Sequence, residues 1–254
     1  MSFLKKLGRK LGAGSPGHAP QMTVLCVGID GAGTSTLIRA MAGTSHSPAA
    51  ARQRKAGETA ADADRSEQAY AKKIQAQHTV GVEEHAVFID SHEIAAQFRT
   101  SSSTSPSAAA APDGSVCARA FAAGLNLRVF NVAGSEGSRA LWRTYYDSAD
   151  GVMYIVDAAD PDRFLEAKEE LEKLLFRSDN IMGKAVASVK VPLLVLANKS
   201  DLQGAMSAEQ LEVKLKTHLF PLDAVHVGSC SAAEQKDIRV NLMWLVEHML
   251  RAAK

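Results

Sequence analysis

The fold is decided by Gly28-Ile29-Asp30-Gly31-Ala32-Gly33-Thr34-Ser35, a stretch that joins an apolar strand-like run to a helix-like segment. Its spacing follows the phosphate-binding loop pattern G-x-x-x-x-G-K-[ST], with Thr34 where the pattern has lysine. Glycines let successive main-chain N–H groups turn inward around a phosphate, and the following helix N-terminus adds a favourable dipole. Ser35 supplies the hydroxyl that binds Mg²⁺ in such loops. The stretch therefore predicts a phosphate cradle without the lysine charge.

Two interpretations of this stretch stay open when it is taken alone. As a phosphate loop, it lacks a charge-assisted contact of about 1.5–3 kcal/mol, which corresponds to about one to two orders of magnitude in affinity. The same residues also suit an ordinary glycine-rich turn between a strand and a helix. The rest of the chain decides between the two.

Strand-like and helix-like segments alternate along the chain, an order that predicts a doubly wound α/β fold with a mostly parallel sheet. Several strand-like runs are apolar almost throughout, as expected of strands that are covered on both faces. The expected strands are Thr23–Gly28, Val82–Asp90, Leu125–Val132, Gly151–Asp157, Pro192–Ala197 and Ala224–Gly228. The expected helices are Ser35–Met41, Asp162–Phe176, Ser207–Leu215 and Asp237–Leu250.

Two stretches, at about 44–77 and 91–123, interrupt this alternation and are interpreted as low-complexity insertions. They are rich in alanine, serine and charge and hold too few large apolar residues to build a core of their own. Within them we expect partial helix around Ala69–Gln77 and disorder over Ser101–Ala111. The expected organisation is an amphipathic helix and linker over 1–20 and one domain over 21–254.

Composition excludes several classes of protein. A chain of 254 residues with 46% hydrophobic residues can bury one sizeable core, and its net charge of +1 gives no sign of a nucleic-acid partner. Cys26, Cys117 and Cys230 are too few and too scattered for a disulfide framework or a zinc site, which indicates a reducing, cytoplasmic compartment. No apolar run approaches the roughly 20 residues that a membrane-spanning helix needs.

The N-terminus is locally basic and amphipathic. At 100° per residue its apolar side chains fall in one stripe and its basic side chains lie opposite, which predicts peripheral contact with a membrane surface. The apolar set is Phe3, Leu4, Leu7 and Leu11, and the basic set is Lys5, Lys6, Arg9 and Lys10. A solvated tail is the alternative. Ser2 stands where myristoylation needs glycine, so the expected anchoring is weak and reversible.

A second motif follows the fifth expected strand. Asn198-Lys199-Ser200-Asp201 matches N-K-x-D and lies at the carboxyl end of a parallel strand, where open α/β sheets bind ligands. The Asp201 carboxylate can accept hydrogen bonds from both the ring N–H and the exocyclic NH₂ of guanine, a pair of donors that adenine lacks. Lys199 would pack its stem along the base. This selectivity disfavours a kinase or ATPase of the phosphate-loop type.

With these motifs in place, the chain resembles the ADP-ribosylation-factor-like (Arf-like) small GTPases. Phe130-Asn131-Val132-Ala133-Gly134-Ser135 is similar to the family's W/F-D-V-G-G-Q, and Leu141-Trp142-Arg143-Thr144-Tyr145-Tyr146 to its L-W-R-x-Y-Y/F; together they form switch II. His78-Thr79-Val80-Gly81 is similar to P-T-I-G of switch I, and Ser229-Cys230-Ser231-Ala232 takes the place of the last guanine-contact loop. The resemblance implies a small GTPase fold with a six-stranded, mostly parallel sheet flanked by helices.

The resemblance also implies the ligands, which are GTP or GDP and Mg²⁺. The implied nucleotide contacts are Asp30, Gly31, Ala32, Gly33, Thr34, Ser35, Thr36, Thr79, Gly134, Asn198, Lys199, Asp201, Ser231 and Ala232, and the implied Mg²⁺ ligands are Ser35 and Thr79. Effector or coat proteins would bind the switch regions. Within the family, the chain looks closest to the member linked to the Bardet-Biedl ciliary coat, which adds the cilium to the expected setting.

Three departures from the family pattern fall where the chemistry would occur. Thr34 replaces the phosphate-loop lysine, Asn131 replaces the aspartate that supports Mg²⁺ through water, and Ser135 replaces the glutamine that orients the attacking water. One hypothesis is a GTP-dependent switch in membrane or vesicle trafficking with impaired hydrolysis and weakened binding of nucleotide and Mg²⁺. The alternative is a pseudo-GTPase, a scaffold without a nucleotide cycle.

Overall fold

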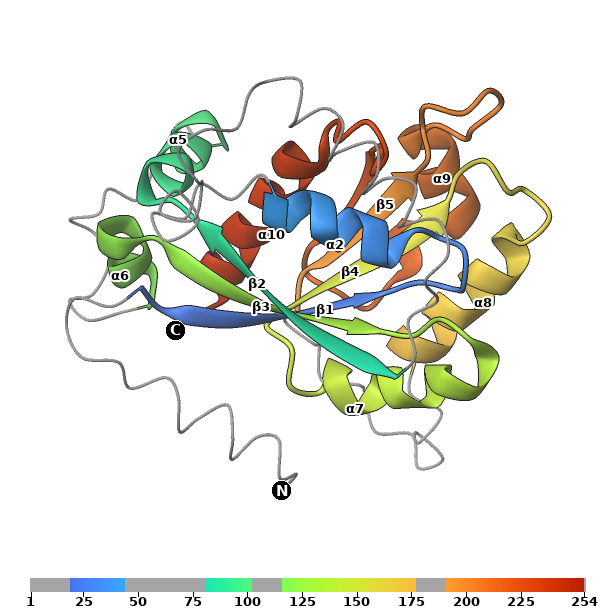
Figure 1. Ribbon diagram of the computed structural model, residues 1–254, viewed down its shortest axis with the longest axis horizontal. Coiled ribbons are helices and arrows are strands. Elements are labelled where there is room, and N and C mark those ends of the chain that lie inside the picture. Colours follow the sequence, from blue (N-terminus) through green and yellow to red (C-terminus); the bar gives the residue numbers. More distant parts are fainter. Residues whose placement is uncertain (1–18, 44–80, 102–115, 177–190, 254) are drawn as a thin grey trace, which may run out of the picture.

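A six-stranded sheet with helices on both faces forms the centre of the molecule (Figure 1). The computed structural model describes residues 19–43, 81–101, 116–176 and 191–253. The strands are β1 Gln21–Val27, β2 Val82–Ile89, β3 Leu125–Val132, β4 Gly151–Asp157, β5 Leu193–Asn198 and β6 Val225–Ser229. They lie in the order β2-β3-β1-β4-β5-β6, with β2 antiparallel to β3 and every other pair parallel. The six predicted strands and the mostly parallel sheet are confirmed.

The central strands are apolar on both faces because each face carries its own core. In β1, Val24 and Cys26 belong to one buried cluster, whereas Leu25 and Val27 belong to the other. Successive side chains of a strand point to opposite faces, so a strand buried on both sides needs an unbroken apolar run. Because β1, β4 and β5 pair in parallel, their carboxyl ends lie at the same edge of the sheet.

Four helices, α2, α5, α6 and α10, cover one face, and α7, α8 and α9 cover the other. The first group is α2 Thr34–Gly43, α5 Ser91–Ser101, α6 Val116–Ala123 and α10 Ile238–Ala252. The second group is α7 Trp142–Tyr146, α8 Phe164–Leu175 and α9 Ala208–Leu215, with 3₁₀ turns η2 Glu136–Leu141 and η3 Thr217–Leu219. The four predicted helices correspond to α2, α8, α9 and α10, with ends that differ by one or two residues.

The ends of the second insertion form α5 and α6, two helices that the sequence did not predict. Ile94 and Phe98 of α5 are buried in the same core as α10, and the rings of Phe98 and Phe121 lie 5.1 Å apart, edge to face. These few apolar side chains do not need a core of their own because they extend the core under α10. The predictions for 44–77, for most of Ser101–Ala111 and for the N-terminal helix lie outside the described residues.

Within the described ranges, no helix has the length and apolar character that crossing a membrane requires.

Candidate functional site

The loop between β1 and α2 has the conformation of a phosphate cradle. Gly31 and Gly33 have φ angles of 83° and 89°, a region that favours glycine. A Cβ added to Gly33 would lie 2.5 Å from Nδ2 of Asn198, so glycine is also needed for close packing. Thr34 begins α2, and Ser35 and Thr36 follow in its first turn, each half-buried. The loop therefore presents the N-terminus of α2 at the carboxyl edge of the sheet, and the phosphate-loop interpretation fits better than an ordinary turn.

A single buried side chain connects this cradle to two other loops. Asn198, at the end of β5, is 1% exposed and donates a hydrogen bond from Nδ2 to the main-chain oxygen of Ala32 at 2.8 Å. Its Oδ1 accepts a hydrogen bond from the main-chain N–H of Ala232 at 3.0 Å. The phosphate loop, the N-K-x-D loop and the loop after β6 are thus held together by protein contacts alone.

Lys199 and Asp201 follow Asn198 in a tight turn. Lys199 has a φ of 63°, and its Nζ lies 2.5 Å from Oδ2 of Asp157, at the end of the neighbouring strand β4. Asp201 is exposed. The turn thus directs Lys199 to Asp157 and leaves the Asp201 side chain exposed, and the contacts of both residues with guanine stay a prediction.

The loop after β6 is closed by its own hydrogen bonds. Ser231 donates its main-chain N–H to the main-chain oxygen of Lys236 at 3.2 Å, and its hydroxyl accepts from the N–H of Glu234 at 3.1 Å. Burial raises the pKa of the neighbouring Cys230 thiol to about 12, so this thiol is neutral at physiological pH. The structure places Ser231 and Ala232 beside Asn198, and their contacts with guanine stay a prediction.

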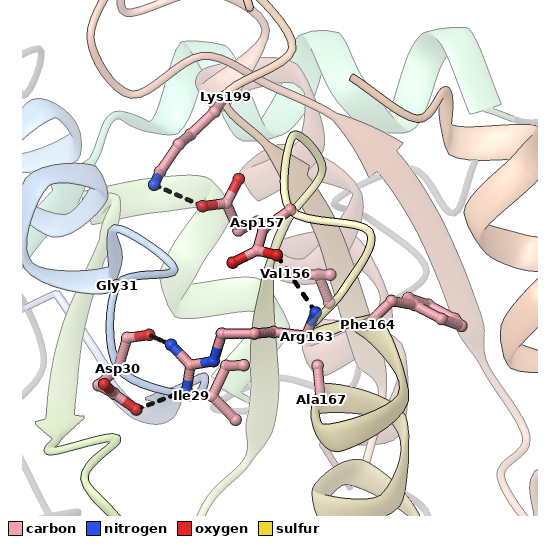
Figure 2. A pocket seen from close by; sticks show the side chains of 10 residues that line it. Ile29, Asp30, Gly31, Val156, Asp157, Arg163, Phe164, Ala167 and Lys199 are labelled. Atoms are coloured by element: carbon pink, nitrogen blue, oxygen red, sulfur yellow. Dashed lines mark hydrogen bonds and ion pairs between the residues drawn. The ribbon is translucent and has the colours of Figure 1, made fainter. Parts of the chain in front are cut away.

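A pocket of about 240 Å³ lies between the phosphate loop, the end of β4 and the start of α8 (Figure 2). The Lys199–Asp157 pair lies on one side of the pocket, and the phosphate-loop residue Asp30 lies on another beside Arg163. The N-K-x-D loop and the phosphate loop, which are far apart in the sequence, therefore line the same polar cavity.

Arg163 holds the outer side of the phosphate loop. Its Nη1 donates to the main-chain oxygen of Asp30 and its Nη2 to the carboxylate of Asp30, each at 2.8 Å, while Nε donates to Glu166 at 3.0 Å. The hydrogen bond from Arg163 holds the pKa of the Asp30 carboxyl below its ordinary value. This arginine therefore fixes the shape of the loop while its charge is neutralised by two acids.

Switch II is held against the phosphate loop by a second arginine. Arg139, in η2, has a side chain that is 9% exposed; its Nε donates to the main-chain oxygen of Gly134 at 2.8 Å, and its Nη2 contacts Glu166 at 2.6 Å. A Cβ on Gly134 would lie 2.6 Å from the main-chain nitrogen of Asp30. Gly134 therefore packs directly on the loop, in the place from which its N–H would meet a terminal phosphate.

Ser135, at the position of the catalytic glutamine, is exposed and donates its hydroxyl to Oγ of Ser138 at 2.9 Å. Ser135 directly precedes η2, and its main-chain oxygen also accepts hydrogen bonds from the N–H groups of Ser138 and Arg139. The side chain is therefore short and engaged in a local contact.

The Mg²⁺ end of the site brings together a hydroxyl, an amide and a carboxylate. Nδ2 of the buried Asn131 donates to Oγ of Ser35 at 3.0 Å and to Oε2 of Glu83 at 3.3 Å. Mg²⁺ prefers oxygen ligands, so the Ser35 hydroxyl and the Glu83 carboxylate would suit the ion together with phosphate oxygens, whereas Asn131 turns its NH₂ group to both of them. Thr79, the other implied ligand, lies outside the described residues, whereas Gly81, the last residue of the switch I motif, accepts a hydrogen bond from the N–H of Ala133 at 2.9 Å.

The aromatic residues of switch II divide between core and surface. Trp142 and Tyr146 are buried, and the indole N–H of Trp142 donates to the main-chain oxygen of Ala133 at 3.0 Å. Tyr145 is half-buried against Phe130, with ring centroids 5.1 Å apart. Core packing accounts for the first two side chains, whereas Phe130 and Tyr145 both stay half-buried at the surface.

Sequence reasoning missed four charged residues that shape the site: Glu83, Arg139, Asp157 and Arg163. Asp157 ends an apolar strand just as Asn198 does, and this position was a usable signal. Arg163 and Glu166 have the i, i+3 spacing of a helical ion pair. Glu83 and Arg139 gave no local signal, because their partners come from other elements.

Comparison with known proteins agrees with this geometry. The model of the ADP-ribosylation factor family matches residues 114–249, just over half of the chain. The chain belongs to the ADP-ribosylation factor family. The match begins after the phosphate loop, so membership rests on α6 to α10, and it confirms the resemblance to Arf-like small GTPases.

Individual Arf-like relatives match about half of the chain. ADP-ribosylation factor-like protein 4D of Homo sapiens is 39% identical over 132 residues, which are 52% of this chain and 62% of that protein. ADP-ribosylation factor-like protein 3 of Chlamydomonas reinhardtii is 31% identical over 126 residues, 50% of this chain and 67% of that protein. The chain thus spans about three fifths to two thirds of the length of these curated relatives.

A solved structure extends the likeness of fold to nearly the whole chain. The Arl6 BBS3 small GTPase from Trypanosoma brucei, determined with the nucleotide analogue GppNp, covers 92% of this chain and 99% of its own, with a TM-score of 0.57 and 20% identity. At this identity the likeness concerns the fold, and the small GTPase fold of this Arf-family protein is confirmed.

Proposed function

We propose that this Arf-family protein binds guanine nucleotide and acts as a GTP-dependent switch with impaired intrinsic hydrolysis. The observation that carries the proposal is the double contact of Asn198, which joins the phosphate loop at Ala32 to the base-recognition loop at Ala232. Binding sites that are already ordered lose less entropy when the ligand binds. Asp201 would select guanine, and the main-chain N–H groups of the cradle would hold the phosphates without lysine.

The proposed impairment of hydrolysis has a local cause. Hydrolysis needs a group that orients the attacking water and a cation at the transferred phosphate. Ser135 is directed to Ser138, and Thr34 brings no charge to the helix N-terminus. We therefore expect the site to recognise a nucleotide but to hydrolyse it slowly.

A pseudo-GTPase scaffold is the competing function, and one observation favours it. Arg139 holds Gly134 of switch II against the phosphate loop through hydrogen bonds within the protein. A switch region that is fixed by protein contacts does not need a phosphate to be ordered. Such a molecule could present its switch surface to a partner permanently.

Measurement of bound nucleotide separates the two functions. The full chain is purified under native conditions, its nucleotide content is determined by chromatography after denaturation, and GDP and GTP are then titrated with and without Mg²⁺. Micromolar or tighter, Mg²⁺-dependent binding supports the switch and overturns the pure scaffold. If binding occurs only in Thr34→Lys, the natural chain is not a nucleotide switch.

We further propose that the switch works in membrane or vesicle trafficking, including trafficking to the cilium, from a cytoplasmic pool with peripheral membrane contact. The amphipathic pattern of residues 2–11 supports membrane contact, and the half-buried Phe130–Tyr145 pair offers effector or coat proteins an aromatic surface on switch II. We expect the full chain to bind anionic liposomes, and binding to weaken with salt and with deletion of residues 2–11. Liposome binding that is unaffected by the deletion contradicts the helix assignment.

A further inference from the structure

The substitution of Asn131 for aspartate removes a negative charge from the Mg²⁺ end of the site, yet the structure holds another carboxylate beside it. Glu83 and Asn131 are direct partners in the antiparallel register of β2 and β3. Oε2 of Glu83 lies 3.3 Å from Nδ2 of Asn131, which in turn lies 3.0 Å from Oγ of Ser35. A carboxylate, an amide and a hydroxyl therefore form one continuous chain of hydrogen bonds.

The face of the strand on which Glu83 lies is the face of the phosphate loop. Glu83 alternates in phase with Val87 and Ile89, which are buried in the core that α2 covers. Glu84 points to the opposite face, where both of its oxygens bind Arg128 at 2.8 and 2.9 Å. Of the two adjacent acids, only Glu83 is directed to the side of the sheet that carries Ser35.

The chemistry of the amide fixes the direction of these hydrogen bonds. An ionised carboxylate only accepts, so Asn131 must present its NH₂ group to Glu83. The same NH₂ group donates to Ser35, so the amide links Glu83 to the hydroxyl that binds Mg²⁺ in phosphate loops. A carboxylate within two hydrogen-bond lengths of a metal-binding hydroxyl is in the range from which outer groups act on a metal and its bound water.

We propose that Glu83 supplies the negative charge that supports Mg²⁺ in this chain, in place of the aspartate that Asn131 replaces. The inference rests on the proposed function, because Mg²⁺ would bind here together with a guanine nucleotide. Glu83 is a positioning residue, 41% exposed at its side chain and thus accessible to water bound to the ion. Its other neighbour is His85, whose Nε2 lies 3.4 Å from the same carboxylate oxygen. A purely structural pairing with His85 is the alternative that the experiment must exclude.

The test uses the full chain loaded with a fluorescent GDP analogue. The rate of nucleotide release is measured over a range of free Mg²⁺, and Mn²⁺ binding to the same complexes is followed by electron paramagnetic resonance. We expect Glu83→Gln to raise the Mg²⁺ concentration for half-maximal retention, and the Mn²⁺ dissociation constant, by about tenfold or more. Glu84→Gln is the matched control and should change both values by less than about twofold, since Glu84 lies on the other face.

A second variant separates charge from structure. In the Glu83→Gln background, Asn131→Asp returns a carboxylate to the neighbouring strand and should restore Mg²⁺ and Mn²⁺ affinity. His85→Gln removes the alternative partner and should leave both affinities unchanged. Nucleotide binding with equal Mg²⁺ dependence in wild type and Glu83→Gln overturns the role of Glu83 and leaves the proposed function standing. Absence of nucleotide from the wild type overturns the proposed function and this inference together.

Discussion

The Nδ2 atom of Asn198 lies 2.8 Å from the main-chain oxygen of Ala32, so a side chain at the end of β5 is hydrogen-bonded to a loop that lies 166 residues away in the sequence. The amide is 1% exposed and also accepts from the main-chain N–H of Ala232. A side chain at Gly33 would collide with Nδ2 of Asn198, so the contact between Asn198 and the loop also requires glycine at this position.

We expect Asn198→Asp to destabilise the fold by about 2–3 kcal/mol. The carboxylate has the shape of the amide but cannot donate to the oxygen of Ala32, so two acceptors would face each other in a buried place. Urea unfolding at neutral pH, followed by circular dichroism, gives the free energy. Asn126→Asp, at an exposed position of β3, is the matched control and should change it by less than about 0.5 kcal/mol. Equal effects of the two variants would show that the contact contributes nothing.

Thr34→Lys should strengthen the binding of GDP and GTP by about tenfold to a hundredfold, because it restores a charge-assisted contact of about 1.5–3 kcal/mol at the N-terminus of α2. Calorimetric titration of nucleotide in the presence of Mg²⁺ measures the change. Thr34→Met lengthens the side chain without charge and is the control. If the methionine variant gains as much affinity as the lysine variant, the effect arises from packing and the electrostatic explanation is wrong.

The sheet was predictable from the sequence because the central strands are buried on both faces. Burial of this kind demands uninterrupted apolar runs, and β1, β4 and β5 stand out for that reason. Asn198 was also predictable, since it belongs to a short local motif. A short motif and a hydrophobic run can both be recognised without knowledge of the topology.

The charge cluster around the phosphate loop was not predictable in this way. Arg139 meets Asp30, Glu166 and Gly134 only after the sheet has brought switch II beside the loop. The same reason applies to α5, whose apolar residues are too sparse for a helical core and become sufficient only on the surface of α10. These features depend on contacts between elements that are far apart in the sequence, so local sequence patterns do not predict them.

Arg139→Met should lower the free energy of unfolding by about 2–3 kcal/mol, because it removes the hydrogen bonds of the arginine to Glu166 and to the main-chain oxygen of Gly134, while Glu170 keeps its ion pair with Lys173. It should also loosen switch II, which hydrogen exchange of the amides in η2 measures. Arg143→Met is the control: this arginine is exposed and its Nη2 donates to the main-chain oxygen of Lys173, so a loss within about 0.5 kcal/mol is expected. Unchanged exchange in η2 of Arg139→Met would contradict a restraining role.

Ser135→Gln should raise the single-turnover rate of GTP hydrolysis by about tenfold or more in the Thr34→Lys background, where nucleotide is retained. The longer amide reaches beyond the local contact with Ser138 and can orient a water molecule. Ser138→Gln, one turn of η2 further on, is the control and should leave the rate unchanged. A rate that does not respond to glutamine at residue 135 would show that Ser135 is not what limits hydrolysis.

Acid should weaken the fold through the carboxyls that the two arginines bind. Hydrogen bonds from Arg163, and from Arg139 to Glu166, lower the pKa values of Asp30 and Glu166 in the folded protein. A lowered pKa means that the unfolded chain binds protons more readily, so the stabilisation is complete above the ordinary carboxyl pKa of about 4 and is lost as the pH falls through the folded values. The contribution of these two carboxyls to the free energy of unfolding should therefore be constant from pH 5 to 7 and should decrease when the pH is lowered below about 4.

A single variant isolates this effect. Glu166→Gln removes the titrating group, so its difference in unfolding free energy from the wild type should be constant between pH 5 and 7 and should shrink as the wild-type carboxyl becomes protonated below about pH 4. Glu169→Gln, on the exposed side of the same helix, controls for net charge. A difference for Glu166→Gln that stays constant down to pH 3 would mean that its ion pairs with Arg139 and Arg163 do not stabilise the fold, and that hydrogen bonds to main-chain oxygens hold the phosphate loop and switch II together.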